Sequence, residues 1–186
     1  MNIFYLHPEA KICATYHVDR HVLKMIIEYA QLMSTAHRVL DGVQDIEHRY
    51  AQGSLPARWR KVKVWRHPDP ELDSGLMKAS HINHPSGVWT RANKENYHWL
   101  YSLWMYLLEE YTHRYGKIHA CEKYKLHLMF FPQNIPDGKF YPPTPAMPDD
   151  CKIGDVLLSY RKYYIDYKNG FAKWKNRERP DWYVVD

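Results

Sequence analysis

Three ionisable side chains share one face of the segment between residues 19 and 40. His21, Lys24 and Glu28 follow one another at steps of three and four residues, so an α-helix would place them along one side over two turns, about 10 Å. A carboxylate held near a cation and an imidazole can stabilise a developing cation or move protons. The plainer interpretation is a solvated stripe with an i,i+4 ion pair, and spacing by itself favours that interpretation.

His17 lies one turn before His21, which is the spacing of two metal ligands on one helical turn. No glutamate follows it in the zincin manner, and third ligands would have to be guessed among Glu28, His37 and His84. With 12 histidines in the chain, one such pair by chance is unremarkable. We therefore predict no cofactor and no metal site, with His17 and His21 as the weaker alternative.

Basic and aromatic residues alternate in two segments, and a net charge of +5 suits a polyanionic partner. Cations neutralise phosphates, while aromatic faces stack on exposed bases. The plainer interpretation is a soluble surface whose tryptophans are anchored in the core. Double-stranded DNA is the favoured partner, and the candidate contacts are Arg20, Arg58, Arg60, Lys61, Lys63, His84, Arg91, Lys173, Lys175, Arg177, Arg179, Trp182 and Tyr183.

The elements that must position these residues are mainly helical. Apolar residues recur at three- and four-residue steps over residues 19–40, which predicts a helix with one buried face, ended by Asp41-Gly42. Further helices are expected over 87–115, 118–129 and 155–168. His84-Pro85, just before the second, fits either a phosphate-contacting loop or a simple helix start.

We therefore expect an all-α fold: a single compact domain over residues 1–186, with three main helices and long irregular connections. Residues 43–84, rich in proline and glycine, are expected to be a long irregular insertion in which Arg58–Arg66 forms a short strand or an extended arm. Six prolines predict an ordered surface loop over 132–150. Residues 171–186 form a basic, aromatic tail.

Composition also excludes several classes of protein. Three cysteines without a CxxC pair do not support a disulfide framework or a structural zinc site. No apolar run approaches ~18 residues, so a membrane span is excluded, and the N-terminus lacks the pattern of a secretory signal. We expect a cytoplasmic protein of undetermined oligomeric state.

Taken in order, several segments resemble the pyrimidine-dimer DNA glycosylase family, the T-even phage endonuclease V type. The resemblance covers the helices and the tail, about two thirds of the chain, whereas residues 43–80 and the proline loop have no counterpart. The segments that resemble the family are Asp19-x-His21-(x)6-Glu28, His84-Pro85 followed by Trp89, Arg114-Tyr115-Gly116, and Arg179-Pro180-x-Trp182-Tyr183.

The resemblance implies an all-α domain that kinks duplex DNA, extrudes a nucleotide and cuts its glycosidic bond. The family's nucleophile is the N-terminal α-amine, which forms an imine with the sugar. Glu28 would stabilise the sugar cation and assist the later strand-cleaving elimination, with His21 in the same site. Trp182 and Tyr183 would line that site or support the DNA.

The chain differs from the family at the N-terminal residues that supply the amine and at two positions of the first helix. Asn2 is large for removal of Met1, and Ile27 and Gln31 stand where the family has two arginines. Either Met1 or Lys24 would then supply the nucleophile. We expect a DNA glycosylase or AP lyase whose catalytic candidates are Glu28, His21, Lys24 and Met1.

Two other classes stay open. A non-catalytic DNA- or RNA-binding module could use the same scaffold, with its affinity carried by the basic segments. A metal- or nucleotide-dependent enzyme of phage-type nucleotide metabolism could instead use His17, His21 and Glu28.

Overall fold

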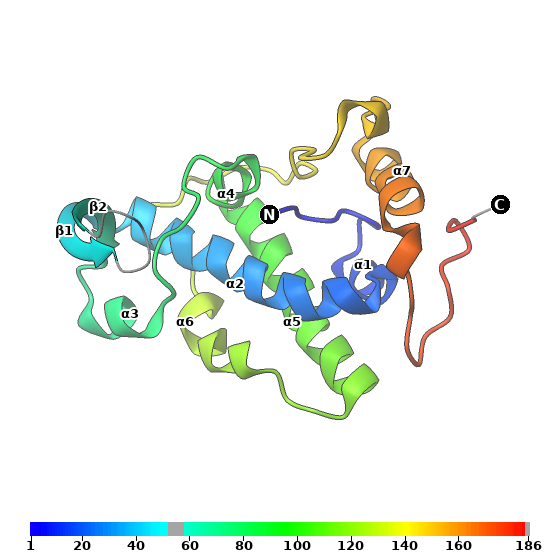
Figure 1. The fold of residues 1–186 in the computed structure, drawn as a ribbon, viewed down its shortest axis with the longest axis horizontal. Coiled ribbons are helices and arrows are strands. Elements are labelled where there is room, and N and C mark those ends of the chain that lie inside the picture. The colour runs from blue at the N-terminus through cyan, green and yellow to red at the C-terminus, as the bar shows by residue number, and fades with distance from the viewer. Residues whose placement is uncertain (52–57, 185–186) are drawn as a thin grey trace.

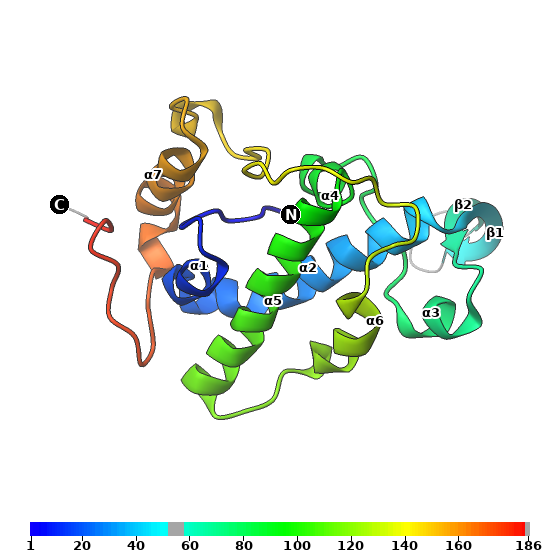
Figure 2. The same cartoon turned by 180° about the vertical axis from the view of Figure 1, so that it is seen from behind.

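Two helices of 22 residues cross at the centre of the structure and supply much of its buried core. The structure is a computed structural model in which residues 1–51 and 58–184 are described. Helix α2 (Asp19–Leu40) packs across helix α5 (Lys94–Tyr115), as Figures 1 and 2 show from opposite sides. The bounds of α2 are those that its apolar periodicity predicts.

The second predicted helix, over residues 87–115, is divided in two. Helix α4 (Pro85–Thr90) is a short separate element. Helix α5 begins after Asn93, whose side chain accepts a hydrogen bond from the Asn96 backbone N–H and so caps a new helix. At its other end Gly116 takes a φ of +64°, the left-handed conformation that commonly ends helices at glycine.

Shorter helices complete the helical part of the structure. The expected helix over 118–129 is a 3-10 turn followed by one short α-helix, and the expected helix over 155–168 is present as α7. No described helix is long and apolar enough to cross a bilayer. The remaining bounds are α1 (Ala10–Tyr16), α3 (Pro70–Gly75), α6 (Lys125–Met129) and α7 (Val156–Lys168), with 3-10 turns η1 (Ala120–Tyr124), η2 (Asp149–Cys151) and η3 (Asn169–Phe171).

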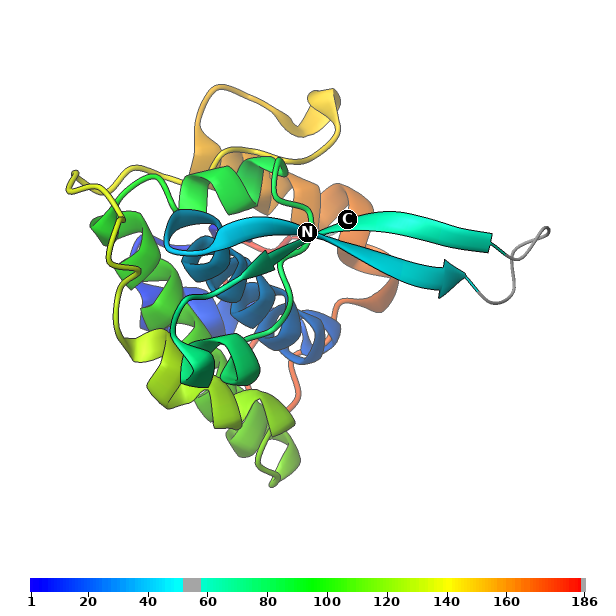
Figure 3. The same ribbon diagram turned by 90° about the vertical axis from the view of Figure 1, so that its left-hand side faces the viewer.

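The prediction of an all-α fold with three main helices is wrong, because the segment after α2 forms an antiparallel β-hairpin. Strand β1 (Val43–Ala51) pairs with strand β2 (Arg58–Arg66). Within β2 the cations Lys61 and Lys63 alternate with the β-branched residues Val62 and Val64, and this two-residue period suits a strand. The described residues form seven α-helices and one two-stranded sheet. The expected irregular insertion over 43–84 thus holds a regular hairpin, which reaches out from the helical body (Figure 3).

The apolar N-terminal segment lies inside the molecule. Ile3 and Leu6 are fully buried, and the Phe4 backbone N–H donates to the Tyr29 hydroxyl of α2 at 3.1 Å. Burial of this segment stabilises the fold through the apolar area removed from water. It also brings the N-terminus to the middle of α2 (Figure 1).

Arg114, near the end of α5, has a fully buried side chain at the junction of three segments. Its guanidinium donates to the backbone carbonyls of Thr15 and His17, at 2.9 and 2.8 Å, where α1 ends. It also lies 3.0 Å from the Asp19 carboxylate at the start of α2 and 3.0 Å from Glu110 on its own helix. A buried charge needs this many partners because burial removes its hydration.

Glu110 extends the same cluster to the C-terminal tail. Its carboxylate accepts from Arg114 and, at 2.6 Å, from Arg177. Burial alone would raise the pKa of Glu110, but the hydrogen bonds and charges of Arg177 and Arg114 outweigh it, so the pKa is lowered. The glutamate is therefore ionised in the folded protein at neutral pH.

We predict that Arg114→Met lowers the free energy of unfolding by about 3–5 kcal/mol, because it leaves Glu110 buried with fewer partners. Urea denaturation followed by circular dichroism measures this change. The matched control is Lys162→Met, which breaks an exposed i,i+4 pair with Asp166 and should leave stability nearly unchanged. Equal effects of the two substitutions would contradict a structural role for the buried cluster.

Candidate functional site

All four predicted catalytic residues line one small cavity. It has a volume of about 100 Å³ and lies where the N-terminal segment passes over α2. Met1 comes from the chain end, and His21, Lys24 and Glu28 come from one face of the helix, as their spacing predicts. The other lining residues are Asn2, Phe4, Met25, Tyr163 and Lys168.

The Glu28 carboxylate presents one paired and one unpaired oxygen. Its Oε1 lies 3.3 Å from the Lys24 Nζ, and the Lys24 side chain is 66% exposed against 18% for Glu28. Its Oε2 is buried and has no hydrogen-bond partner. A buried acceptor without a partner is costly, so Oε2 is the atom that a bound ligand would satisfy.

His21 is held as a neutral imidazole beside this carboxylate. Its ring stacks on Phe4 with centroids 4.2 Å apart, and its Nδ1 lies 2.6 Å from the Tyr164 hydroxyl. Burial, with a smaller contribution from nearby positive charges such as Lys168 and Lys24, lowers the pKa of His21 to about 2. At neutral pH His21 is therefore not an acid. Its role in the site is to hold a fixed position through the hydrogen bond with the Tyr164 hydroxyl.

His84 belongs to the same electrostatic neighbourhood. It caps α4, accepting the Ser86 backbone N–H on Nδ1 at 3.2 Å. Burial is the main cause that lowers its pKa, the positive charges of the N-terminal amine and His81 add to this, and Glu28 acts in the opposite direction. The amine, His84 and Glu28 thus lie within electrostatic range of one another.

Two residues that line the cavity were not among the predicted catalytic residues. Tyr163 and Lys168 project from α7, and the Lys168 Nζ lies 3.0 Å from the Tyr163 hydroxyl and 4.3 Å from its ring centroid. Lys168 adds a second lysine to the cavity. No local motif marks these residues, because α7 meets α2 only through the tertiary fold.

The weaker metal alternative at His17 and His21 does not fit the structure. His17 is fully buried, with its Nδ1 2.8 Å from the Cys13 carbonyl and its Nε2 3.3 Å from the Tyr29 hydroxyl. Because the carbonyl can only accept, Nδ1 donates, and Nε2 accepts from the hydroxyl. Burial lowers the pKa of His17 to about 4. Both ring nitrogens are occupied, so no lone pair is left for a metal shared with His21.

The aromatic residues of the tail lie outside the cavity. Tyr183 is 4% exposed, and the Trp182 ring carries the Arg161 guanidinium 5.0 Å from its centroid. Trp182 also contacts Tyr164, with centroids 6.2 Å apart. Trp182 therefore packs against Tyr164, the residue whose hydroxyl contacts His21.

The basic residues of the tail are mostly on the surface. Lys173, Lys175 and Arg179 are exposed. The Lys175 Nζ lies 5.3 Å from the Tyr115 ring centroid, and Arg177 is engaged with Glu110. The tail thus combines core anchors with solvent-facing cations.

The β-hairpin sorts its charges onto two faces. The strand register puts Lys61 and Lys63 on one face together with Tyr50 and Trp59, whose rings contact edge to face at 5.6 Å. Both aromatic side chains are largely exposed. We call this set the basic-aromatic face.

The opposite face of the hairpin carries Arg60 and an ion-pair network. Arg66 pairs with Asp45 and Glu47, and Glu47 also pairs with Arg49. The cations Arg49 and Arg66 of this face are paired with carboxylates, whereas no carboxylate lies among the residues of the basic-aromatic face. The side chain of Arg58, also a predicted DNA contact, lies outside the described side chains.

Two further predicted DNA contacts flank the helical body. Arg20 is exposed, with its guanidinium 4.9 Å from the Phe171 ring centroid. Arg91 is partly buried beside α4, and burial lowers its pKa. The structure thus leaves the predicted DNA-binding residues in three separate places: the hairpin, the tail and the surroundings of α2 and α4.

Comparison of the chain with protein-family models, with curated proteins and with solved structures gave no match.

The buried neutral histidines predict that stability falls in mild acid. The pKa values of His17 and His21 are lowered from 6.5 to about 4 and about 2. The unfolded chain therefore takes up protons below about pH 6.5 that the folded chain refuses, and stability drops by about 1.4 kcal/mol per pH unit for each such histidine.

Urea denaturation between pH 7 and pH 5 measures this slope. His21→Asn, which keeps an acceptor near the Nδ1 position, should reduce the slope by up to one proton. Exposed His98 is the matched control, and His98→Asn should leave the slope unchanged. A stability that stays constant from pH 7 to pH 5 would contradict the neutral state of the buried rings.

Proposed function

We propose that the cavity is the active site of a DNA-acting enzyme of the base-excision type, a glycosylase or AP lyase for damaged or modified bases. One observation carries the proposal: primary amines and the unpaired Glu28 oxygen line the same cavity. An amine can form an imine with a sugar aldehyde, and a carboxylate beside it can stabilise the cation and move the protons.

The Met1 α-amine is the better nucleophile of the two predicted candidates. The Lys24 Nζ is engaged in an ion pair with Glu28 at 3.3 Å. Within the described part of the chain, the Met1 amine has no ion-pair partner. An α-amine ordinarily titrates near ~7.7–8.0 and is partly neutral at cytoplasmic pH.

In the proposed reaction the amine nitrogen bonds to C1′ of the deoxyribose while the bond from C1′ to the base breaks. The base leaves with that electron pair and takes up a proton, and the sugar ring opens to an imine. Glu28 then removes a C2′ proton, the 3′ phosphate leaves, and water hydrolyses the imine. Neutral His21 supports the site through its hydrogen bond to Tyr164.

Surface features near the cavity suit a duplex that must be opened. Leu23 and Ile27 flank Lys24 on the outer side of α2 and are 39% and 49% exposed. Apolar side chains of this kind can enter a base step and unstack it. Cations at Arg20 and on the basic-aromatic face of the hairpin would neutralise phosphates on either side. We place this activity in the cytoplasm, in keeping with three unpaired cysteines.

The second candidate is a non-catalytic DNA- or RNA-binding module. The observation that favours it is the basic-aromatic face of the hairpin, where Lys61 and Lys63 stand beside exposed Trp59. Such a face binds single strands or opened duplexes through stacking and charge. The two candidate functions differ at Glu28, because the enzyme requires its carboxylate for catalysis and the binding module does not.

We predict that borohydride traps a covalent adduct between the protein and duplex DNA that contains an abasic site. Glu28→Gln should reduce the rate of trapping by about 10²-fold or more, because it removes proton transfer without changing shape. Glu109→Gln, at an exposed position of α5, is the matched control and should react like the wild type.

An N-terminal extension tests the identity of the nucleophile. Adding two residues before Met1 should abolish trapping, whereas Lys24→Met should still form the adduct. Absence of any adduct with the wild-type protein, or equal trapping by Glu28→Gln, would contradict the proposed function and favour the binding module.

We also predict that the double substitution Lys61→Gln, Lys63→Gln weakens binding to duplex DNA. The slope of log affinity against log salt should fall by about 2, since each phosphate contact contributes roughly 0.9. The control is Lys152→Gln, Lys162→Gln, which removes two cations that already pair with Asp149 and Asp166. An unchanged salt slope in the hairpin variant would exclude that face as the DNA contact.

A further inference from the structure

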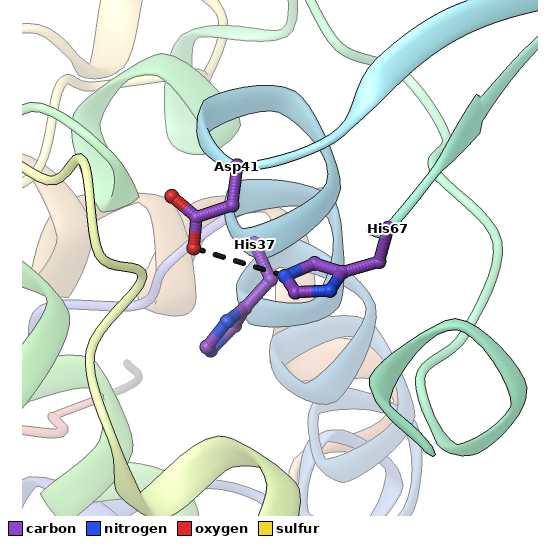
Figure 4. A group of neighbouring side chains, drawn as sticks. All are labelled: His37, Asp41 and His67. Atoms are coloured by element: carbon purple, nitrogen blue, oxygen red, sulfur yellow. Dashed lines mark ion pairs between the residues drawn. The ribbon is translucent and has the colours of Figure 1, made fainter. Parts of the chain in front are cut away.

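Two histidines and an aspartate converge at the far end of α2, away from the proposed active site. His37 lies in the last turn of α2, Asp41 directly follows that helix, and His67 follows β2 (Figure 4). One ligand atom of each residue lies within 4.8 Å of the other two, and the His67 Nε2 is 3.8 Å from the Asp41 Oδ2. All three side chains are at least nine-tenths buried.

One ring nitrogen of His37 has no hydrogen-bond partner. The Tyr97 hydroxyl donates to the Leu128 carbonyl at 3.1 Å, so its oxygen accepts from the His37 Nε2 at 2.9 Å. The ring proton therefore sits on Nε2, and Nδ1 keeps its lone pair. That Nδ1 is buried and has no hydrogen-bond partner.

The His37 ring is neutral. Burial lowers its pKa to about 4, against smaller opposite effects of Asp41 and of the nearby Phe130 backbone. A neutral imidazole whose remote nitrogen donates to a fixed acceptor has the arrangement of a metal ligand.

Asp41 and His67 complete the convergence. The Asp41 carboxylate accepts the backbone N–H groups of Gln133 and Asn134, at 2.8 and 2.9 Å, which fixes its orientation. The His67 Nε2 is buried and has no hydrogen-bond partner. Two buried imidazole nitrogens without partners, in a cluster with one buried carboxylate, are not explained by packing.

We propose that His37 Nδ1, Asp41 Oδ2 and His67 Nε2 bind a divalent transition-metal ion of the zinc class. Imidazole nitrogen and carboxylate oxygen are ligands that Zn²⁺ accepts at about 2.0–2.2 Å. A tetrahedral ion holds such ligands about 3.4 Å apart, so rotations of the side chains would close the present distances. The positive ion would also offset the buried aspartate charge.

Occupation requires one rearrangement at His67. Its Nδ1 now accepts the Asp69 backbone N–H at 3.1 Å, so the ring proton sits on Nε2. Ion binding moves that proton to Nδ1 and releases the Asp69 N–H. Asp69 is exposed at the start of α3, where water can take over as acceptor.

The three ligands also line a cleft of about 620 Å³. Its rim includes the exposed rings of Phe130 and Phe131 and the exposed Leu126. Three protein ligands with one open position are typical of catalytic rather than structural zinc sites. The open position of the ion would face this cleft.

The test is Zn²⁺ binding to the full, tag-free chain, measured by equilibrium dialysis with metal analysis. The wild type should bind one Zn²⁺ per chain at micromolar or lower concentration, and Co²⁺ should give the visible absorption bands of a tetrahedral site. Each of two ligand variants should weaken Zn²⁺ binding at least about tenfold. They are His37→Gln, which keeps a donor toward Tyr97, and His67→Asn, which keeps an acceptor near the Asp69 N–H.

The matched control is His98→Gln, which removes an exposed histidine and should bind Zn²⁺ like the wild type. Circular dichroism checks that the variants fold, and the Co²⁺ spectrum of the wild type decides the question if they do not. Zn²⁺ binding no tighter than on the order of 1 mM, a Co²⁺ spectrum without tetrahedral bands, or unchanged binding in both ligand variants would overturn the proposal. None of these readouts depends on the activity proposed for Glu28.

Discussion

The buried guanidinium of Arg114 is the contact on which the position of the proposed active site depends. It joins the end of α1, the start of α2 and the end of α5 through hydrogen bonds to main-chain and carboxylate oxygens. Asp19 in turn accepts the Lys175 backbone N–H, which adds the tail. Because α2 is a rigid helix, fixing its first residue fixes the direction in which His21 and Glu28 project.

The second constraint is the burial of the N-terminal segment. Ile3 and Leu6 are inside the core, so the chain end cannot move away from α2 without exposing apolar surface. The amine is thereby held near Glu28, although nothing covalent requires it. The cavity also contains two buried oxygens without hydrogen-bond partners, on Asn2 and Glu28. Such oxygens lower the stability of the fold, and proteins retain them mainly at functional sites.

Helix α2 carries two independent groups of ionisable residues. Glu28 and His37 are nine residues apart, which on an α-helix places them on opposite faces. One face meets the N-terminus and α7, and the other meets the turn after β2 and the loop after α6. The two cavities share no lining residue, so a change at one leaves the chemistry of the other intact.

The amino-acid sequence by itself determined the bounds of α2 and the common face of His21, Lys24 and Glu28. Helical periodicity is a local property, and it was strong in this segment. The β-hairpin was harder to predict, because strand pairing joins residues that are distant in the chain and proline and glycine nearby indicated an irregular segment. Its alternating cations and aromatic residues nevertheless contained the two-residue period of β2.

Only the tertiary structure decided which groups meet. It placed Met1 and Lys168 beside Glu28, and His67 beside His37, over separations that no local pattern encodes. It also showed that Trp182 and Tyr183 of the tail pack against the core and do not line the cavity. The sequence could not distinguish these roles, because base stacking and core packing use the same residue types. Chemistry at a site depends on distances between side chains, and those distances arise only when the whole core is assembled.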